Sequence, residues 1–229
     1  MSLTRTPETP SGTAAVRTPT STTARKVAAT SAALFAVALF MTVASVDVPH
    51  DPSNAALLHW WQVSGNRTSG LVSGLSAICA AVLFAVVVNH LRSLRAASKA
   101  PQWQAFAHSM GAAVTALWLV TGAARAAIGH LVDVMGEPLP GTDVLRFATA
   151  LNYTLLGLSG MGVLGLSILA ISVVVLRTSA LGRWVGFVGA GCAAIILVAV
   201  AAQLGAFTTP VAILWAFCLA VAIWRQPQV

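Results

Sequence analysis

The chain has 229 residues, of which 57% are hydrophobic and only 8% are charged. A soluble domain carries roughly 25% charged residues, because its surface must face water. This composition therefore excludes an ordinary soluble domain and predicts a protein surrounded mostly by lipid. The formal net charge of +7 would suggest nucleic-acid binding in a soluble protein. Here the basic residues lie between apolar runs, where they indicate membrane topology instead.

Residues 1–24 are rich in Thr, Ser and Pro and lack apolar periodicity. Such a segment buries too little apolar surface to offset the entropy of ordering it, so we expect a disordered cytoplasmic tail. Residues 25–229 are then expected to form the transmembrane domain. Cleavage of a signal peptide after Val43-Ala44-Ser45 is an alternative, but the long leader and the apolar run of 20 residues favour an uncleaved first helix.

Six apolar runs follow the tail, at residues 27–46, 70–91, 104–131, 147–176, 184–204 and 210–224. A helix needs about 20 residues to cross a bilayer core of roughly 30 Å. Because the runs are continuous rather than alternating, they predict helices and not a β-barrel. We therefore expect an all-α, polytopic transmembrane bundle of six helices. A further short helix is expected over residues 55–61, in the interface on the outer side.

The basic residues determine the expected orientation. If the N-terminus is cytoplasmic, ten of the thirteen basic residues lie on the inner side and five of the six acidic residues on the outer side. An excess of Lys and Arg marks cytoplasmic segments, so we expect both termini in the cytoplasm and a multi-pass chain in the plasma (inner) membrane. Aromatic residues gather at both membrane interfaces. The expected outer pair is Trp60 and Trp61, and the expected inner set is Trp103, Trp184 and Trp224.

The stretch Gly157-Leu158-Ser159-Gly160 in the fourth apolar run resembles the motif in which rhomboid intramembrane proteases carry their catalytic serine. A serine hydroxyl needs a base within hydrogen-bond reach to become a nucleophile. The last histidine of the chain is His130, so the sixth run holds none. At about 1.5 Å per residue, His130 and His108 lie at other depths than Ser159. We therefore predict no catalytic residue and interpret the glycines as a face that packs closely against a neighbouring helix.

Arg125 is a charged residue inside an apolar run, about 9 Å from the outer end of the third helix. An unpaired arginine at the centre of a membrane costs roughly 2.5–3.5 kcal/mol. Small residues flank Arg125, so we expect it to face other helices and to form an ion pair. The expected partner is Asp47, with Asp133, Glu137 and Asp143 as alternatives. Contact with a ligand anion and snorkelling toward the interface without a partner are the remaining alternatives.

The outer ends of the helices are expected to gather a polar cluster, which is the candidate ligand-binding site: Arg125, His130, Asp133, Asp47 and His50. His130 and Asp133 are spaced i, i+3, so they could share a metal ion. The spacing matches no specific metal signature, and we predict no metal site. His90 and His108 lie in the same half of adjacent helices, an arrangement that can hold haem. Nothing else in the sequence supports a cofactor, so none is predicted.

Residues 176–194, LRTSALGRWVGFVGAGCAA, carry Arg-Trp-x-Gly-x-x-Gly at the start of the fifth apolar run, and Leu214-Trp215 lie in the last run. Together with the helix count and loop pattern over residues 25–225, this stretch resembles the small six-helix bacterial membrane proteins grouped as domain of unknown function 4386. The resemblance implies a bacterial inner-membrane protein. It implies no particular reaction, because the family has no assigned activity.

The sequence therefore favours a non-catalytic membrane module that binds a protein partner or senses a small ligand. Its small-residue helix faces would serve a partner or a second copy within the lipid bilayer. The first alternative is a small-solute transporter that uses Arg125 and the outer polar cluster. The second alternative is a metal- or haem-dependent membrane enzyme. Nucleic acid is not expected as a partner.

Overall fold

A computed structural model describes residues 22–45, 53–93, 100–179 and 181–226. The elements in chain order are α1 (Thr22–Ala44), α2 (Asn54–Gln62), α3 (Ser64–Ser93), α4 (Pro101–Gly129), π-helical η2 (His130–Val134), α5 (Thr142–Tyr153), π-helical η3 (Thr154–Gly160), α6 (Met161–Thr178), α7 (Arg183–Ala201), the 3-10 turn η4 (Gly205–Thr208) and α8 (Thr209–Trp224). Six segments are long and apolar enough to cross a membrane, and the described residues contain no strand. The predicted all-helical architecture with six spans is therefore confirmed.

Several helices begin earlier than their apolar runs. α3 starts at Ser64 rather than near residue 70, and α5 starts at Thr142 rather than near residue 147. Hydropathy marks only the part of a helix that lies in lipid. Polar turns can continue the same helix beyond that part, so the apolar runs gave the number of spans but not their ends.

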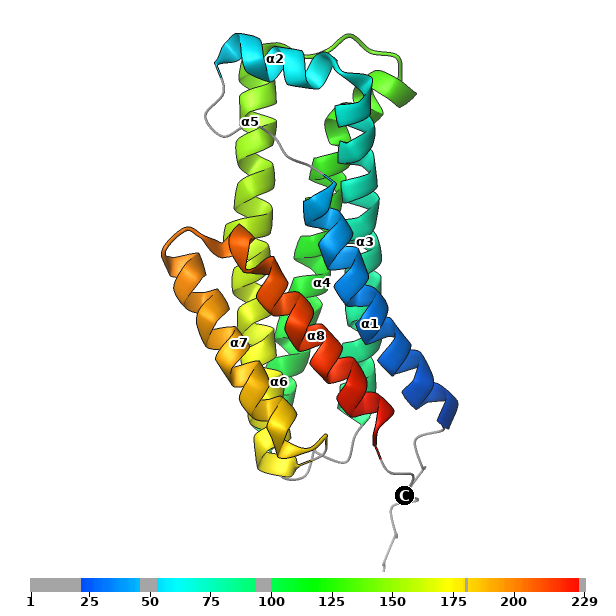
Figure 1. The fold of residues 1–229 in the computed structure, drawn as a ribbon, viewed down its shortest axis with the longest axis vertical. Coiled ribbons are helices and arrows are strands. Elements are labelled where there is room, and N and C mark those ends of the chain that lie inside the picture. Colours follow the sequence, from blue (N-terminus) through cyan, green and yellow to red (C-terminus); the bar gives the residue numbers. More distant parts are fainter. Residues whose placement is uncertain (1–21, 46–52, 94–99, 180, 227–229) are drawn as a thin grey trace, which may run out of the picture.

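The first two helices also bear on the expected boundaries. α1 begins at Thr22, so residues 22–24, the last three of the predicted tail, are helical. Residues 1–21 lie outside the described part of the chain. α2 spans Asn54–Gln62, so the short helix expected over residues 55–61 is confirmed. This short helix lies across one end of the bundle (Figure 1).

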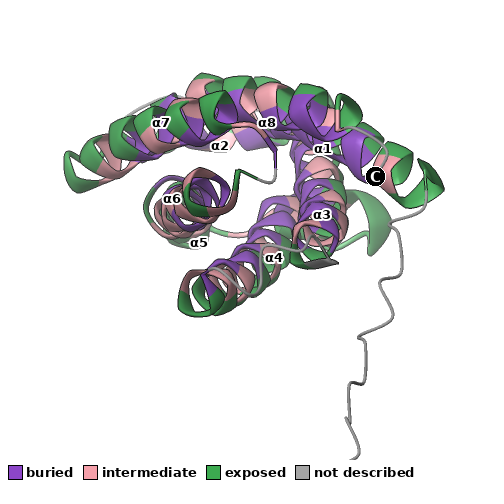
Figure 2. Ribbon diagram, turned by 90° about the horizontal axis from the view of Figure 1, so that it is seen from below, coloured by how far each residue is buried: buried purple, intermediate pink, exposed green. Residues whose placement is uncertain are grey.

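The six long segments form a closed ring, because each contacts two neighbours in the order α3, α4, α6, α7, α8, α1 and back to α3. Figure 2 shows α7, α8 and α1 in one row, with α6 and the α3–α4 pair on one side of it. We call the end across which α2 lies the capped end. We call the opposite end the terminal end, because Arg25 near the start of α1 there donates a hydrogen bond to the backbone carbonyl of Gln226.

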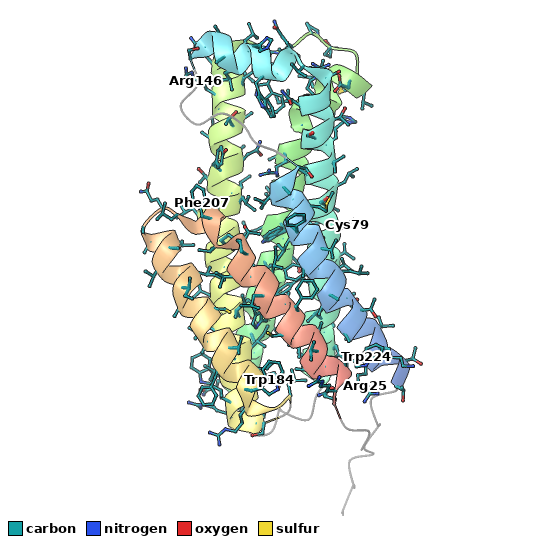
Figure 3. All side chains as sticks on the ribbon, in the orientation of Figure 1. Arg25, Cys79, Arg146, Trp184, Phe207 and Trp224 are labelled. Carbon is teal, nitrogen blue, oxygen red and sulfur yellow. The ribbon has the colours of Figure 1, made fainter. Side chains whose placement is uncertain are left out.

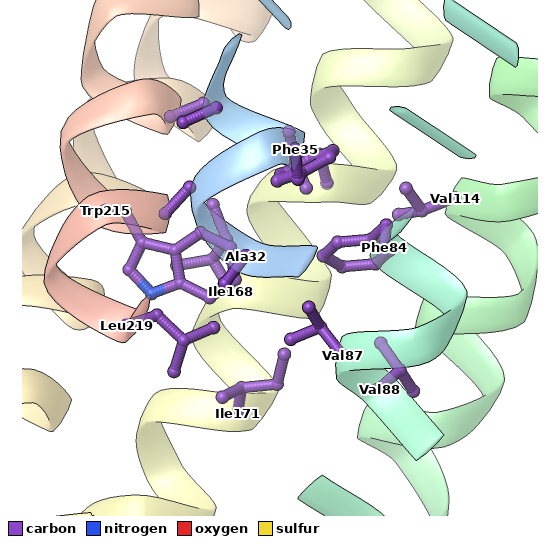
Figure 4. Close-up of a cluster of buried hydrophobic side chains, with 14 of the residues drawn as sticks. Ala32, Phe35, Phe84, Val87, Val88, Val114, Ile168, Ile171, Trp215 and Leu219 are labelled. Atoms are coloured by element: carbon purple, nitrogen blue, oxygen red, sulfur yellow. The ribbon is translucent and has the colours of Figure 1, made fainter. Parts of the chain in front are cut away.

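Apolar side chains fill the ring and also cover its outside. Phe35 of α1, Phe84 of α3 and Trp215 of α8 are at most 1% exposed, and their ring centroids lie 5.1 Å (Phe35–Phe84) and 6.4 Å (Phe84–Trp215) apart (Figure 4). On the outside, Phe187 and Val198 of α7 are 61% and 70% exposed. A large exposed apolar surface is unfavourable in water but suits lipid. The described fold is therefore that of a multi-pass membrane protein.

Unequal segment lengths shape the capped end. α7 has 19 residues, whereas segments 101–134 and 142–178 have 34 and 37. At about 1.5 Å per residue, α7 matches a bilayer core of roughly 30 Å, while the longer segments reach about 50–55 Å. The turn between α7 and α8 contacts Gly157, where a Cβ would lie 3.2 Å from the backbone N of Ala206. Residues 142–156 therefore continue about 22 Å past the turn, where α7 and α8 no longer complete the ring (Figure 1).

Candidate functional site

The capped end is built on one apolar face of α2. Leu57 and Trp61 are 1% and 2% exposed and pack with Ile128 of α4 and Leu145 of α5. Residues four apart share one face of a helix. α2 therefore rests on two of the long helices, and Trp61 is directed into the bundle.

Arg67 of α3 ties α2 to the rest of the capped end. Its Nε and Nη2 contact Asp133 Oδ1 at 2.8 and 2.7 Å, and its Nη1 donates to the carbonyls of Trp61 and Gln62 at 2.8 and 2.9 Å. These carbonyls belong to the last turn of α2, where helical N–H partners run out and a cation is favoured. Asp133 was expected as an alternative partner of Arg125. That expectation is wrong, because Arg67 holds this carboxylate.

Arg146 of α5 holds the other end of α2. Its Nε and Nη2 donate to Asn54 Oδ1 at 2.9 and 2.7 Å, and Figure 3 shows its side chain beside the start of α2. The same figure places Phe207 at the turn between α7 and α8, and Trp184 and Trp224 at the terminal end. The tryptophans of α2 therefore lie at the opposite end from Trp184 and Trp224, as expected for two aromatic belts.

α3 and α4 approach each other closely just below the cap. A Cβ on Gly74 would lie 2.5 Å from the carbonyl oxygen of Gly122, and one on Gly70 would lie 3.3 Å from the carbonyl oxygen of Arg125. The spacing Gly70-x-x-x-Gly74 is the small-residue pattern that allows helix backbones to meet in membranes. This contact brings Ser73, the neighbour of Gly74, within reach of Arg125.

Arg125 joins three helices. It is 9% exposed and donates from Nε to Ser73 Oγ at 2.6 Å and from Nη2 to the backbone carbonyl of Thr42 at 3.1 Å. Ser73 Oγ donates to the same carbonyl at 2.6 Å. Thr42 lies in the last turn of α1, which ends at Ala44. Arg125 therefore caps a carbonyl in the turn where helical N–H partners run out.

The acidic residues in the described part do not neutralise Arg125. Its hydrogen bonds there go to a hydroxyl and a carbonyl, and the one ion pair found in the described part joins Arg67 and Asp133. The expected pairing of Arg125 with Asp133 or, as alternatives, with Glu137 or Asp143 is therefore wrong. The physical reason is register, because the end of α1 lies closer to Arg125 than those carboxylates do. Asp47, the first expected partner, lies outside the described residues.

A cavity of about 820 Å³ lies beside Arg125 at the capped end. Sites for small molecules commonly measure 300–1,000 Å³ and are mostly apolar with a few polar groups. Among the described residues, the polar side chains of its lining are Arg125, Thr149, Asn152, Tyr153, Thr154 and Gln203. Much of the remaining lining is apolar and includes Val43, Trp61, Leu156, Leu158, Ala206 and Phe207. We call this space the capped-end cavity.

Several polar atoms of the cavity-lining residues lack partners in the described part of the chain. Asn152 Oδ1 and Trp61 Nε1 are buried without a hydrogen bond. The hydrogen bonds found for Arg125 use Nε and Nη2, not Nη1. Buried polar groups are almost always bonded in native structures. Other buried atoms without a partner, such as Ser167 Oγ, lie elsewhere in the described part. The cavity wall also includes the π-helical segment 154–160, and such segments are frequent at functional sites.

The other predicted cluster residues are not placed at this cavity. His130 is exposed and Asp133 is paired as described, and neither lines the cavity. Asp47 and His50 fall outside the described residues. Arg125 is thus the predicted site residue that the structure brings to the cavity. In the described ranges, no three His, Cys, Asp or Glu side chains come together in a way that could hold a metal ion.

Ser159 lies in η3, where the neighbouring glycines make close contacts. Gly157 meets Ala206 of η4, and a Cβ on Gly160 would lie 3.5 Å from Trp118 Nε1. Among the described hydrogen bonds, none joins Ser159 to a histidine. The interpretation of these glycines as a close-packing face is therefore confirmed.

The two histidines considered for haem face different neighbours. His90 interacts with Gln226 of the C-terminal segment. His108 instead lines a separate small cavity of about 30 Å³ near Leu181, and His90 is not part of that lining. The described structure does not direct the two imidazoles into a shared space.

Apart from Arg125, the described cavity-lining residues were not predicted as site residues, and the positions of Ser73 and Trp61 were also not anticipated. Ser73 holds Arg125 at the end of α1, and its signal in the sequence is its position beside Gly74 in the small-residue pattern. Trp61 was interpreted only as an interfacial anchor, although its spacing of four residues from Leu57 already indicates a shared buried face.

The fold and the site define a class: a six-span helical membrane protein with a cavity of ligand size at its capped end. Searches of protein-family models, curated proteins and solved structures found no match to this chain. The resemblance to domain of unknown function 4386 therefore stays a prediction.

Proposed function

We propose that this protein is a non-catalytic membrane module that binds a small ligand in the capped-end cavity. The observation that carries the proposal is the buried Arg125 beside a cavity of about 820 Å³, bonded in the described part only to neutral groups. A guanidinium is always charged. Burying one is unfavourable unless it is bonded and compensated, which makes such a residue a default functional candidate in a membrane.

The proposal includes an orientation. The described basic residues at or near the terminal end are Arg25, Lys26, Arg92, Arg177, Arg183 and Arg225. At the capped end, the two surface arginines both hold α2 in place. An excess of Lys and Arg marks the cytoplasmic side, so the proposed ligand reaches the cavity from outside the plasma (inner) membrane of a bacterium. Both termini are then cytoplasmic, and the module senses or captures its ligand externally.

Binding is favoured over transport by the packing below the cavity. Trp118 of α4, 1% exposed, packs on Gly160, and Met161 and Leu164 are fully buried. This layer lies within two turns of Gly157, which lines the cavity. A solute would have to displace these side chains to continue toward the terminal end. Transport is the second candidate, because π-helical η3 interrupts the regular helix at the cavity wall, where helix geometry can change.

The proposal is tested by filling the cavity with a larger side chain. Thr149 of α5 lines the cavity, so Thr149→Trp should occupy it and abolish ligand-induced thermal stabilisation of the purified protein in nanodiscs. Phe147 lies on the same helix but is 68% exposed, so Phe147→Trp is the matched control and should keep the response. The ligands are decanoate, decanol and decylamine, which share one apolar chain. If none stabilises the wild-type protein, or if both variants respond alike, the proposal is wrong. Uptake of the same compounds into proteoliposomes would favour transport.

A further inference from the structure

The capped-end cavity combines one cation with a mostly apolar wall, and this combination specifies a class of ligand. We propose that the cavity takes a monocarboxylate with an apolar chain, whose carboxylate contacts Arg125. This inference rests on the proposed function and adds the chemistry of the ligand. Its carboxylate lies at Arg125, and its chain lies against Leu156 and Phe207.

The charge of the ligand follows from the lining. Among the described residues that line the cavity, Arg125 is the one basic residue and none is acidic. A single buried cation is neutralised by a single anion, whereas a dianionic phosphate would leave an uncompensated negative charge. Arginine presents a planar fork of donors that matches a carboxylate. A ligand with one carboxylate therefore matches the charge of the described lining.

The donors available at Arg125 fit the same ligand. Nε and Nη2 are already used to hold Ser73 and the end of α1, while Nη1 has no hydrogen bond in the described part. A ligand carboxylate can accept from Nη1 without breaking the contacts that fix the guanidinium. The site is then preorganised, and binding needs no rearrangement of Arg125.

The apolar part of the ligand follows from the other wall. Leu156 and Leu158 of η3 and Phe207 of η4 line the cavity, and Leu158 and Phe207 are 52% and 69% exposed. Phe207 lies at the turn between α7 and α8 (Figure 3), where the segment that matches the bilayer thickness ends. An apolar chain therefore finds apolar contacts beside the boundary of the membrane. An amphipathic carboxylate can enter from the membrane or from water. A ligand from either source would carry a carboxylate and an apolar chain.

The test uses the full chain in phosphatidylcholine nanodiscs, with binding to empty nanodiscs subtracted. Radiolabelled decanoate is displaced by unlabelled decanoate, methyl decanoate, decanol and decylamine. We expect decanoate to bind at least about tenfold more tightly than methyl decanoate, because a hydrogen bond to a charged group separates them. Decylamine should not compete. If methyl decanoate or decanol binds as tightly as decanoate, the carboxylate class is overturned while ligand binding stands. If no compound binds, the proposed function fails as well.

Variants locate the carboxylate. Arg125→Gln should weaken the binding of decanoate at least about tenfold and leave the binding of methyl decanoate unchanged. Arg125→Lys should keep the preference for the acid over the ester. Arg183→Gln removes a cation from an exposed position at the terminal end, outside the cavity lining, and should bind decanoate as wild type does. Equal losses of decanoate affinity in Arg125→Gln and Arg183→Gln would overturn the assignment. If Arg125→Gln does not fold, the ratio of the affinities for decanoate and methyl decanoate, measured on the wild-type protein, decides whether the carboxylate is recognised.

Two further arms complete the design. Hexanoate and hexadecanoate identify the source: preference for the long chain indicates the membrane, and preference for the short chain indicates the aqueous phase. Affinity that is independent of chain length would contradict the apolar contacts. Decanoate binding that occurs only in Asp47→Asn would show that an internal carboxylate neutralises Arg125, and this would overturn the proposal.

Discussion

The close contact between α3 and α4 makes a quantitative prediction for Gly74→Ala. The new Cβ would lie 2.5 Å from the carbonyl oxygen of Gly122, about 0.9 Å short of the 3.4 Å at which ordinary contact begins. The obstacle is backbone, so the helices must separate. A separation of this size in the same direction would stretch the 2.6 Å bond between Ser73 Oγ and Arg125 Nε to about 3.5 Å, beyond the usual range for N–H···O bonds.

The size of the effect is measured as the difference in the free energy of unfolding between two alanine variants. Overpacking in a tight site costs about 1–3 kcal/mol, and replacing glycine by alanine in a helix contributes about 1 kcal/mol in the opposite direction. Gly191 of α7 has nothing within 4 Å of its ideal Cβ, so Gly191→Ala retains only the second contribution. We therefore expect Gly74→Ala to be about 1–3 kcal/mol less stable than Gly191→Ala.

The assay is equilibrium unfolding in mixed micelles of dodecyl maltoside and increasing SDS, followed by far-UV circular dichroism. Gly122→Ala should behave like Gly74→Ala, because its Cβ would lie 2.6 Å from the carbonyl oxygen of Gly74. Equal stability of Gly74→Ala and Gly191→Ala would refute the close approach of the two backbones. It would also remove the structural reason for placing Ser73 against Arg125.

Three other predictions concern the cap and the orientation. A double-mutant cycle of Arg67→Gln and Asp133→Asn should give a coupling energy of about 1 kcal/mol, because the pair is partly exposed (12% and 27%); strict additivity would show that the ion pair does not form. Trp61→Ala should lower stability by about 3–5 kcal/mol and make α2 sensitive to added protease, and an unchanged digestion pattern would contradict its role in holding the cap. A C-terminal green fluorescent protein fusion should fluoresce and a C-terminal alkaline phosphatase fusion should be inactive, since the terminal end is proposed to be cytoplasmic; the reverse result would invert the orientation.

The number of spans was predictable because it depends on composition alone. Five of the six apolar runs are long enough to cross a bilayer. The sixth, residues 210–224, reaches that length in the structure as Gly205–Trp224. No alternative arrangement satisfies the backbone hydrogen bonds of these runs in lipid. Helix ends were less predictable. Residues 64–69 and 142–146 are polar enough to interrupt the hydropathy pattern, but as helix they carry Arg67 and Arg146, which bind α2. Contacts with the cap stabilise these turns, and hydropathy does not report such contacts.

Arg125 was identifiable from the sequence because a charge inside an apolar run is rare and expensive. The partners of Arg125 were not identifiable from the sequence. Ser73 is an unremarkable small residue in a helix, and the carbonyl of Thr42 exists in any sequence. Both become partners only because α1 ends beside α3, within reach of the Arg125 side chain of α4, which depends on helix register and length. The predicted pairing assumed that a cation seeks a carboxylate, whereas the end of a helix also attracts a cation.

The cavity is also a consequence of helix length. α7 and α8 are about as long as the bilayer core is thick, and their turn stops at Gly157, while α3, α4 and α5 continue. Above the turn the ring loses two members, so the side chains there cannot fill the space that six helices enclose below. α2 covers the end of this space but does not fill it. α1 ends at the same cavity, since Val43 and Ala44 line it, and the carbonyl of the buried Thr42 in its last turn accepts from Ser73 and Arg125. Arg125 thus caps α1 through Nη2, and in the proposed function its Nη1 binds the ligand in the cavity.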